Sequence, residues 1–320
     1  MISVGQQAIV RIGAALLQLF VAAAVLFATL RLAPGDPLDR IQGAARLSGA
    51  ARDQLAHEYG LDESMGTQFI HWLQGSVTGD LGRSYQSGLP VADLVLPRLE
   101  ITLQLAAMAF VVVSILGISL GVLSALNRGK PLDGFLSTIT LGAAALSPYI
   151  SAIILLSVFA VALGWFPLLG SGEAGWDRFY HLILPALALS VPSIALVART
   201  TRASLTRVLA TEFIEVLTSR GLPQTRVVLG HALRNALLPV LTIAGLTLAF
   251  LTVGTVFVEY TFGIAGLGSL LVDAVQARDY AVVQSVALIF VVVFVVGSTV
   301  VDVLYKVVDP RIRTHERSAQ

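Results

Sequence analysis

The chain has 320 residues, of which 56% are hydrophobic and 13% are charged. A soluble domain is about 45–50% apolar and about 25% charged, so this composition excludes an ordinary soluble protein. The formal net charge is only +1, and the absence of cysteine excludes disulfides, thiolate metal sites and cysteine nucleophiles.

The apolar residues gather in six blocks, each close to or above the roughly 20 residues needed to cross a bilayer core. The sequence therefore predicts an all-α integral membrane protein with six transmembrane helices. In chain order we place these helices at 12–32, 102–126, 135–163, 182–198, 237–258 and 282–305. The first is longer than a signal-peptide core and lacks a small-residue cleavage site, so we expect it to be retained. The fourth is short and contains Pro185 and Pro192, whose freed backbone groups neighbouring helices could satisfy.

The segment 33–98 is too polar to lie in the membrane and too long to be a simple turn. It predicts an extracytoplasmic loop domain after the first helix. Within it, Phe69, Ile70, Trp72 and Leu73 indicate a short amphipathic helix that lies on the membrane surface.

Lysine and arginine in short loops predict which side of the membrane each loop faces. Twelve such residues fall on one side and two on the other. The larger group is Arg128, Lys130, Arg199, Arg202, Arg207, Arg220, Arg226, Arg234, Lys306, Arg311, Arg313 and Arg317, and the smaller is Arg178 and Arg278. We therefore expect both termini, and the loop from 199 to 235, to face the cytoplasm.

The loop 199–235 reads as two short helices separated by a glycine. Thr211 and the acidic residues that follow it suit a helix start, Gly221 interrupts, and Pro223 suits the first turn of a second helix. In the second helix an apolar side is expected from Val227, Val228, Leu233 and Leu237. Three interpretations stay open from the residues alone: a lipid-facing amphipathic helix, a connector whose arginines only set topology, or a docking element for a cytoplasmic partner.

The same loop carries a resemblance to a known family. Glu215, five residues, Gly221 and a basic helix ending at Leu238-Pro239 resemble the cytoplasmic EAA loop of ABC-importer permeases. The string GHALRNALLPV resembles the version in the dipeptide, oligopeptide and nickel permeases, and further strings agree along almost the whole chain. These are RLAPGDP (31–37), YGLDESMGTQFIHWLQGSVTGDLGRSY (59–85), Pro90-Val91, VEYTFGIAGLGSLLVDAVQARDYAVVQ (258–284) and VDPRIR (308–313).

The chain departs from the family pattern at a few positions. Val216 and Leu217 stand where the motif is named for two alanines, and Glu100, Ala265 and Ala281 stand where proline is frequent. These changes affect the expected local helix packing and leave the resemblance intact.

The resemblance implies the type I ABC importer permease fold and a non-catalytic subunit of the bacterial inner membrane. Its expected partners are a second homologous permease, two cytoplasmic ABC ATPases, an extracytoplasmic solute-binding protein and membrane lipid, with no nucleic acid and no cofactor or metal. It implies that the EAA loop docks on an ATPase, with Glu215 holding the hairpin together internally. The candidate coupling residues are Glu215, Arg220, Gly221, Leu222, Arg226 and Arg234.

The resemblance also implies a division of the chain and a class of cargo. Residues 1–100 would form the first helix and external loop, 101–305 the transmembrane core with its coupling loop at 199–236, and 306–320 a cytoplasmic tail. The cargo would be a dipeptide, an oligopeptide, or a related solute such as a nickel or metal chelate. No G-x-x-x-x-G-K-[ST] motif occurs, so ATP hydrolysis is expected on separate chains. An ATP-independent secondary transporter or channel is the alternative.

Three further patterns have competing explanations. Gly117-Ile118-Ser119-Leu120-Gly121 fits both a serine-hydrolase elbow and a close helix–helix contact, and we favour the contact. The glycines at 263, 266 and 268 are expected to shape an external turn before a short helix. Asp302 is expected to form a local ion pair with Lys306.

Overall fold

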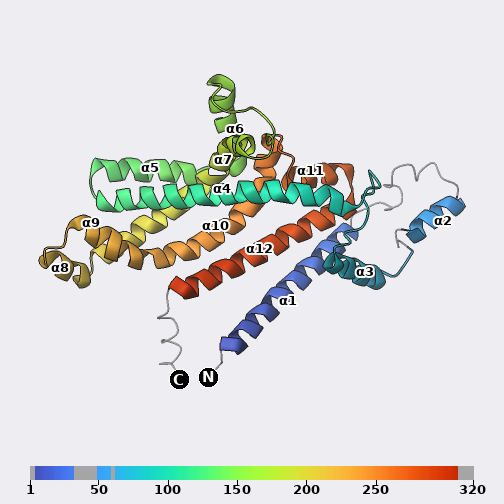
Figure 1. Cartoon of the computed structure of the whole chain (residues 1–320), viewed down its shortest axis with the longest axis horizontal. Helices are drawn as coiled ribbons and strands as arrows, with labels where there is room; N and C mark the ends of the chain where they lie inside the picture. The colour runs from blue at the N-terminus through green and yellow to red at the C-terminus, as the bar shows by residue number, and fades with distance from the viewer. Residues whose placement is uncertain (1–3, 32–48, 59–61, 309–320) are drawn as a thin grey trace. The chain divides into compact units, whose positions relative to one another are not determined.

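The computed structural model describes residues 4–31, 49–58 and 62–308, and in these ranges all regular structure is helical apart from one isolated bridge between Arg83 and Pro90 (Figure 1). The RLAPGDP string beyond its first residue, most of VDPRIR, and Arg311, Arg313 and Arg317 lie outside the described residues, as do the side chains of Asp302 and Lys306. The helices are α1 (Val4–Arg31), α2 (Gly49–Glu58), α3 (Met65–Thr78), α4 (Val91–Leu126), α5 (Pro131–Ala145), α6 (Pro148–Leu155), the π-helix η3 (Leu156–Ala162), α7 (Trp176–Leu209), α8 (Glu212–Ser219), α9 (Gln224–Arg226), the π-helix η4 (Val227–Ala232), α10 (Leu233–Thr261), α11 (Leu267–Ala277) and α12 (Tyr280–Val308).

Each of the six predicted blocks is mainly helical, and the all-α prediction is confirmed for the described residues. Three continuous helices are long and apolar enough to cross a membrane, at Val91–Leu126, Trp176–Leu209 and Tyr280–Thr299. Two further candidates are bent pairs, Pro131–Ala145 with Pro148–Ala162 and Gln224–Leu237 with Pro239–Leu248. The remaining block corresponds to the shorter apolar stretch Gly13–Thr29 of α1.

The prediction of one continuous helix at 135–163 is wrong, because the helix breaks at Leu146 and Ser147 and the chain bends by 108° between α5 and α6. Leu146 is extended, Ser147 caps α6 by accepting a hydrogen bond from the Ile150 amide at 3.3 Å, and Pro148 occupies the first turn. A proline disfavours helical geometry in the residue before it and has no N–H to donate. These two restrictions end α5 and allow α6 to start in a new direction.

The predicted helix at 182–198 is too short, since α7 runs for 34 residues and contains both Pro185 and Pro192. Its flanks carry Asp177 and Arg178 at one end and Arg199, Arg202 and Arg207 at the other. A prediction from hydropathy ends the helix at these charged residues, whereas the backbone continues as a helix beyond them. The two prolines are accommodated inside a helix whose neighbours cover it along much of its length.

The residues divide into two compact units, one formed by 1–102 and 265–295 and the other by 103–264 and 296–320. In the first unit, the start of α4 packs against α11 and α12 around a buried core. That core consists of Val91, Val95, Leu267, Leu270, Ala274, Val282, Val283 and Val286. The rings of Phe69 and Trp72 on α3 pack on Phe27 of α1, with centroids 5.4 and 6.0 Å from it. The apolar face of α3 is therefore in part covered by protein.

A buried carboxylate fastens the loop that precedes α4 to the turn between α11 and α12. Asp279 is 3% exposed and accepts a 2.5 Å hydrogen bond from the Ser84 hydroxyl. The backbone amides of Tyr85 and Gln86 also donate to it, at 3.1 and 3.3 Å. The glycines before α11 shape a turn as expected: Gly263 has φ +58° and Gly266 caps the helix.

In the second unit, α7 packs against α5, α6 and α10, and it approaches α4 closely at two glycines. A β-carbon at Gly117 would lie 2.8 Å from the side chain of Val197, and one at Gly121 would lie 2.5 Å from Cβ of Thr201 and 2.7 Å from the carbonyl of Ala198. The G-x-x-x-G interpretation is thus confirmed. Ser119 is exposed on the continuous helix α4, so the strand–turn–helix setting of a nucleophile elbow is not met.

This contact predicts a position-specific cost of adding one methyl group. Gly121→Ala should lower the thermal midpoint of the detergent-purified protein, because forced overpacking typically costs about 1–3 kcal/mol. Gly142→Ala in α5 is the matched control, since a β-carbon there meets nothing within 4 Å. It should leave the midpoint unchanged or raise it slightly, because alanine favours a helix. Equal midpoints for the two variants would contradict the close contact.

Candidate functional site

The segment 211–236 forms a helical hairpin at the end of α7, and its turn is built on one glycine. Gly221 has φ +78°, a left-handed conformation that favours glycine. Its amide donates to the carbonyl of Thr218 at 2.9 Å, and the amide of Leu222 donates to the carbonyl of Leu217 at 3.4 Å. This pair of bonds is a Schellman motif, which stops α8 and reverses the chain before Pro223.

The inner face of the hairpin packs on the ends of two long helices. The cluster there consists of Ala125 from α4, Leu205 from α7, and Ile214, Val227, Ala232 and Ala236 from the hairpin and the start of α10. Leu217 and Leu222, the two residues joined by the Schellman bond, are half-buried against it. The hairpin is therefore seated on α4 and α7 by side-chain packing and is not a loose loop.

The outer face of the hairpin mixes cationic and large apolar side chains. Arg220, Arg226 and Arg234 are exposed. Beside them in sequence, Phe213 and Val216 are each 50% exposed and Leu229 is 63% exposed. The ring of Phe213 meets that of His231 edge-on at 6.3 Å. Arginine and aromatic residues are enriched at protein–protein interfaces, and the exposed Val216 and Leu229 add apolar area beside them.

Sequence reasoning located the arginines of this face but missed its apolar members. Phe213 and Val216 are three residues apart, and the buried Ile214 and half-buried Leu217 repeat the same spacing one position later. Two interleaved apolar pairs at helical spacing indicate a short helix with two apolar sides. The sequence itself therefore carries the signal for the exposed apolar side of this helix.

The remaining predicted residues fall into two environments. Glu215 is exposed, and its carboxylate accepts no hydrogen bond and forms no ion pair within the described part of the chain. Leu222 faces the inner cluster. Val227 and Val228 are buried, as the expected apolar side of the second helix requires.

A second feature beside the hairpin, missed by sequence reasoning, is an ion pair between Asp133 and Arg202. The guanidinium of Arg202 in α7 donates from Nε and Nη2 to the two carboxylate oxygens of Asp133 in α5, each at 2.7 Å. The hydroxyl of Ser124 in α4 donates to the same carboxylate at 2.5 Å, and the amide of Gly129 donates at 3.2 Å. One buried carboxylate therefore joins α4, α5 and α7.

This ion pair adjoins the packing cluster of the hairpin. Ser124 precedes Ala125 in sequence, and Arg202 lies three residues before Leu205, and both Ala125 and Leu205 belong to that cluster. The only sequence signal was one acidic residue next to Arg128 and Lys130, in a loop expected to be cationic. A bidentate carboxylate–guanidinium pair also fixes orientation, because both groups are planar.

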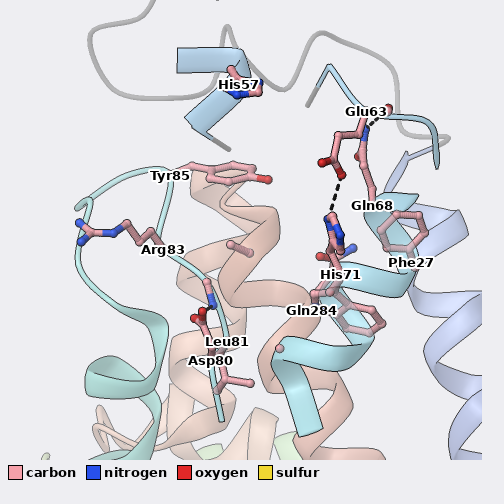
Figure 2. Close-up of a pocket in the computed structure, with 14 residues that line it drawn as sticks. Phe27, His57, Glu63, Gln68, His71, Asp80, Leu81, Arg83, Tyr85 and Gln284 are labelled. Carbon is pink, nitrogen blue, oxygen red and sulfur yellow. Dashed lines mark hydrogen bonds and ion pairs between the residues drawn. The ribbon is translucent and has the colours of Figure 1, made fainter. Parts of the chain in front are cut away.

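The first unit holds a polar hollow of about 540 Å³ that is independent of the hairpin. It is lined by residues of α1, α2, α3, the loop 80–85 and the start of α12. Glu63 and His71 face each other there, with a carboxylate oxygen 3.0 Å from Nδ1, as Figure 2 shows. His57 pairs with Asp62 at 2.9 Å, and this hydrogen bond raises the pKa of His57 and lowers the pKa of Asp62.

Comparison with known proteins gives two family matches that together cover most of the chain. Residues 117–314 match the family described as binding-protein-dependent transport system inner membrane component, and residues 6–106 match the corresponding N-terminal family. A probable peptide ABC transporter permease of Sinorhizobium fredii, y4tP, is 36% identical over 293 residues, which is 90% of this chain and 93% of the relative. The glutathione transport system permease GsiC of Escherichia coli K12 is 38% identical over 298 residues, 92% of this chain and 94% of the relative.

Loss of either charge in the Asp133–Arg202 pair should destabilise the protein. Asp133→Asn and Arg202→Gln should each lower the thermal midpoint in detergent, because each leaves the other charge partly buried without its partner. Asp273→Asn is the matched control, since Asp273 is exposed on α11. The exchange Asp133→Arg with Arg202→Asp should recover part of the loss, and a midpoint for Asp133→Asn equal to that of the control would contradict the role of the pair.

Proposed function

The chain belongs to the inner-membrane components of binding-protein-dependent transport systems, and from this premise we propose that it couples ATP hydrolysis on partner subunits to the import of small peptides. Membership makes it a multi-pass, non-catalytic permease subunit of an ABC importer with the type I fold. ATPase and solute-binding subunits are its general partners. The resemblance read from the EAA loop is confirmed at this level.

The observation that supports coupling through 211–236 is the contrast between the two faces of this hairpin. Its inner face is packed on α4 and α7, whereas its outer face exposes three arginines together with Phe213, Val216 and Leu229. A connector that only set topology would need the arginines but not the exposed apolar side chains. A partner that grips the outer face would move both long helices, because the inner face is fastened to them.

Small peptides are the proposed cargo because of what the relatives are named for. One relative is named for peptides and another for glutathione, which is itself a tripeptide. We favour short peptides with a thiol-containing tripeptide among them. A nickel or other metal chelate is the second candidate and rests only on the wider family resemblance.

The assembly we propose contains this chain, a second homologous permease, two ATPases and a solute-binding protein. Both termini face the cytoplasm, as the distribution of lysine and arginine predicts. Residues 1–100 would present the external face to the binding protein together with 259–281, residues 101–305 would form the transmembrane core, and 306–320 a cytoplasmic tail. The clamp between Ser84 and Asp279 supports a shared external face, since it joins these two parts of the sequence.

Reversing single charges on the outer face should weaken ATPase binding. Arg220→Glu and Arg226→Glu should each reduce ATPase affinity about tenfold in a pull-down from mild detergent, because rim and core charges contribute at this scale to interfaces. Arg128→Glu carries the same change of charge on an exposed site outside the hairpin and should stay within about twofold of the native chain. Equal losses in all three variants would indicate a general charge effect instead of a docking face.

Gly221→Trp tests the turn itself. A side chain at φ +78° is strained whatever the space around it, and Trp at this point would also enlarge the tip of the hairpin. We expect the purified variant to retain its helix content and lose ATP-driven uptake. Unchanged ATPase binding and uptake would remove the hairpin from the mechanism.

The function as a whole is tested by uptake into vesicles that contain the assembled subunits. Labelled glutathione and a labelled dipeptide should enter only when the binding protein, the ATPases and ATP are all present. Uptake that persists without ATP would favour the secondary transporter or channel. Competition by a nickel chelate, with no competition by peptides, would instead favour the chelate as cargo.

A further inference from the structure

The segment between η3 and α7 is largely exposed, and its first ten residues, 163–172, carry no charge, whereas Glu173, Asp177 and Arg178 follow them. Residues 134–172 contain no Asp, Glu, Lys, Arg or His. A surface that faces water normally carries about 25–35% charged residues. The part of this stretch that follows η3 therefore has the wrong chemistry for a loop surrounded by water.

Large aromatic and aliphatic side chains occupy this surface. Trp165 is 59% exposed, Leu169 is 59% exposed and Trp176 is 80% exposed. The apolar surface continues backwards along η3, where Val158 and Val161 are 43% and 65% exposed. Since η3 belongs to a candidate transmembrane segment of a multi-pass membrane protein, the loop continues the exposed apolar surface of that segment.

The rings are held in place by the loop's own contacts. Phe166 stacks on Tyr180 at a centroid distance of 5.7 Å, and Trp176 stacks on Phe179 at 5.2 Å. The hydroxyl of Tyr180 donates to the carbonyl of Trp165. A ring that is already fixed in an exposed position loses little conformational freedom when lipid surrounds it. This arrangement therefore favours insertion of the rings into lipid over packing of the rings against the protein.

We propose that this aromatic loop, residues 164–180, is an anchor that lies at the boundary between lipid headgroups and acyl chains. Tryptophan and tyrosine concentrate at this boundary because each has an apolar ring and a polar tip. The indole N–H groups of Trp165 and Trp176 donate to no acceptor in the described ranges, which leaves both for lipid carbonyl or phosphate oxygens. Continuity with η3 excludes a water-soluble partner, and of the occupants within the membrane the exposed indole rings favour the lipid boundary.

The charged groups of the loop, Glu173, Asp177 and Arg178, all lie in its second half. The carboxylate of Asp177 accepts a hydrogen bond from the amide of Glu173 at 2.7 Å and lies 3.4 Å from Nδ1 of His181. The two carboxylates can therefore remain on the aqueous side while the rings of Trp165 and Trp176 enter the boundary region. This placement leaves the turn at Gly172 and Gly175 nearest to water.

The test uses the absence of cysteine in the chain. Single nitroxide labels are placed on Leu168→Cys and Trp176→Cys in the complete importer, with the cysteines of its partner subunits replaced, in phospholipid vesicles. Electron paramagnetic resonance saturation then compares collisions with oxygen, which concentrates in lipid, and with a water-soluble nickel chelate. We expect oxygen to exceed the chelate at both positions by at least about threefold, because the labels lie in the boundary region.

Lys130→Cys provides the reference, since Lys130 is exposed in the turn between α4 and α5 and should favour the chelate. Leu168 and Trp176 are both exposed, so neither label needs to displace a buried side chain. Chelate-dominated collisions at the two loop positions would place the loop in water and overturn the anchor. Protection from both reagents would place it under a protein partner and would also overturn it. None of these outcomes depends on coupling through the hairpin or on the identity of the cargo.

Discussion

The close approach of α4 to α7 is the contact on which the second unit depends. It is possible because Gly117 and Gly121 present only backbone to Val197 and Thr201. In a bilayer there is little hydrophobic gain from bringing two apolar helices together, so tight packing of small residues is a main source of association. The contact also fixes where the later residues of both helices lie. Ser124 and Arg202 are carried to positions from which both can reach one carboxylate.

The carboxylate of Asp133 fixes the relative orientation of the helices that pack at this contact. Asp133 accepts from α4, from its own turn and twice from Arg202, so the ends of three helices share one set of hydrogen bonds. A buried charge pair is favourable only when its remaining lone pairs are satisfied, and this one meets that condition. The hairpin then rests on Ala125 and Leu205, next to Ser124 and one turn beyond Arg202. A force on the hairpin would act on a joined group of helices instead of being absorbed by a flexible connection.

Much of this arrangement could be predicted, and the parts that could not have physical reasons. The six apolar blocks are visible because a bilayer demands long uncharged runs, and the turn at Gly221 is visible because few other residues tolerate its φ. The break at Ser147-Pro148 has a local signal, but its direction depends on tertiary packing. The pairing of Asp133 with Arg202 joins residues 69 positions apart, which a single sequence does not reveal. On the hairpin the arginines were found while Phe213 and Leu229 were overlooked, and the roles of Glu215, Arg220, Arg226 and Arg234 stay predictions.

The length of α7 relates the two exposed surfaces of the second unit to each other. Residues 179–198 contain no Asp, Glu, Lys or Arg, and at about 1.5 Å per residue they span about 30 Å, the thickness of a hydrocarbon core. If the aromatic rings at the start of α7 lie at one boundary, Arg199 lies at the other. The stretch from Arg199 to Leu209 then carries the helix about 15 Å further into water before the hairpin begins. At that distance the tip of the hairpin, with Arg220, lies beyond the headgroup region unless α7 is strongly tilted, whereas Arg234 lies at the start of α10, where the chain returns toward the membrane. Of the three interpretations of the hairpin, namely a lipid-facing helix, a connector and a docking element, the lipid-facing one is then the weakest. Its exposed apolar side chains fit the surface of a protein partner.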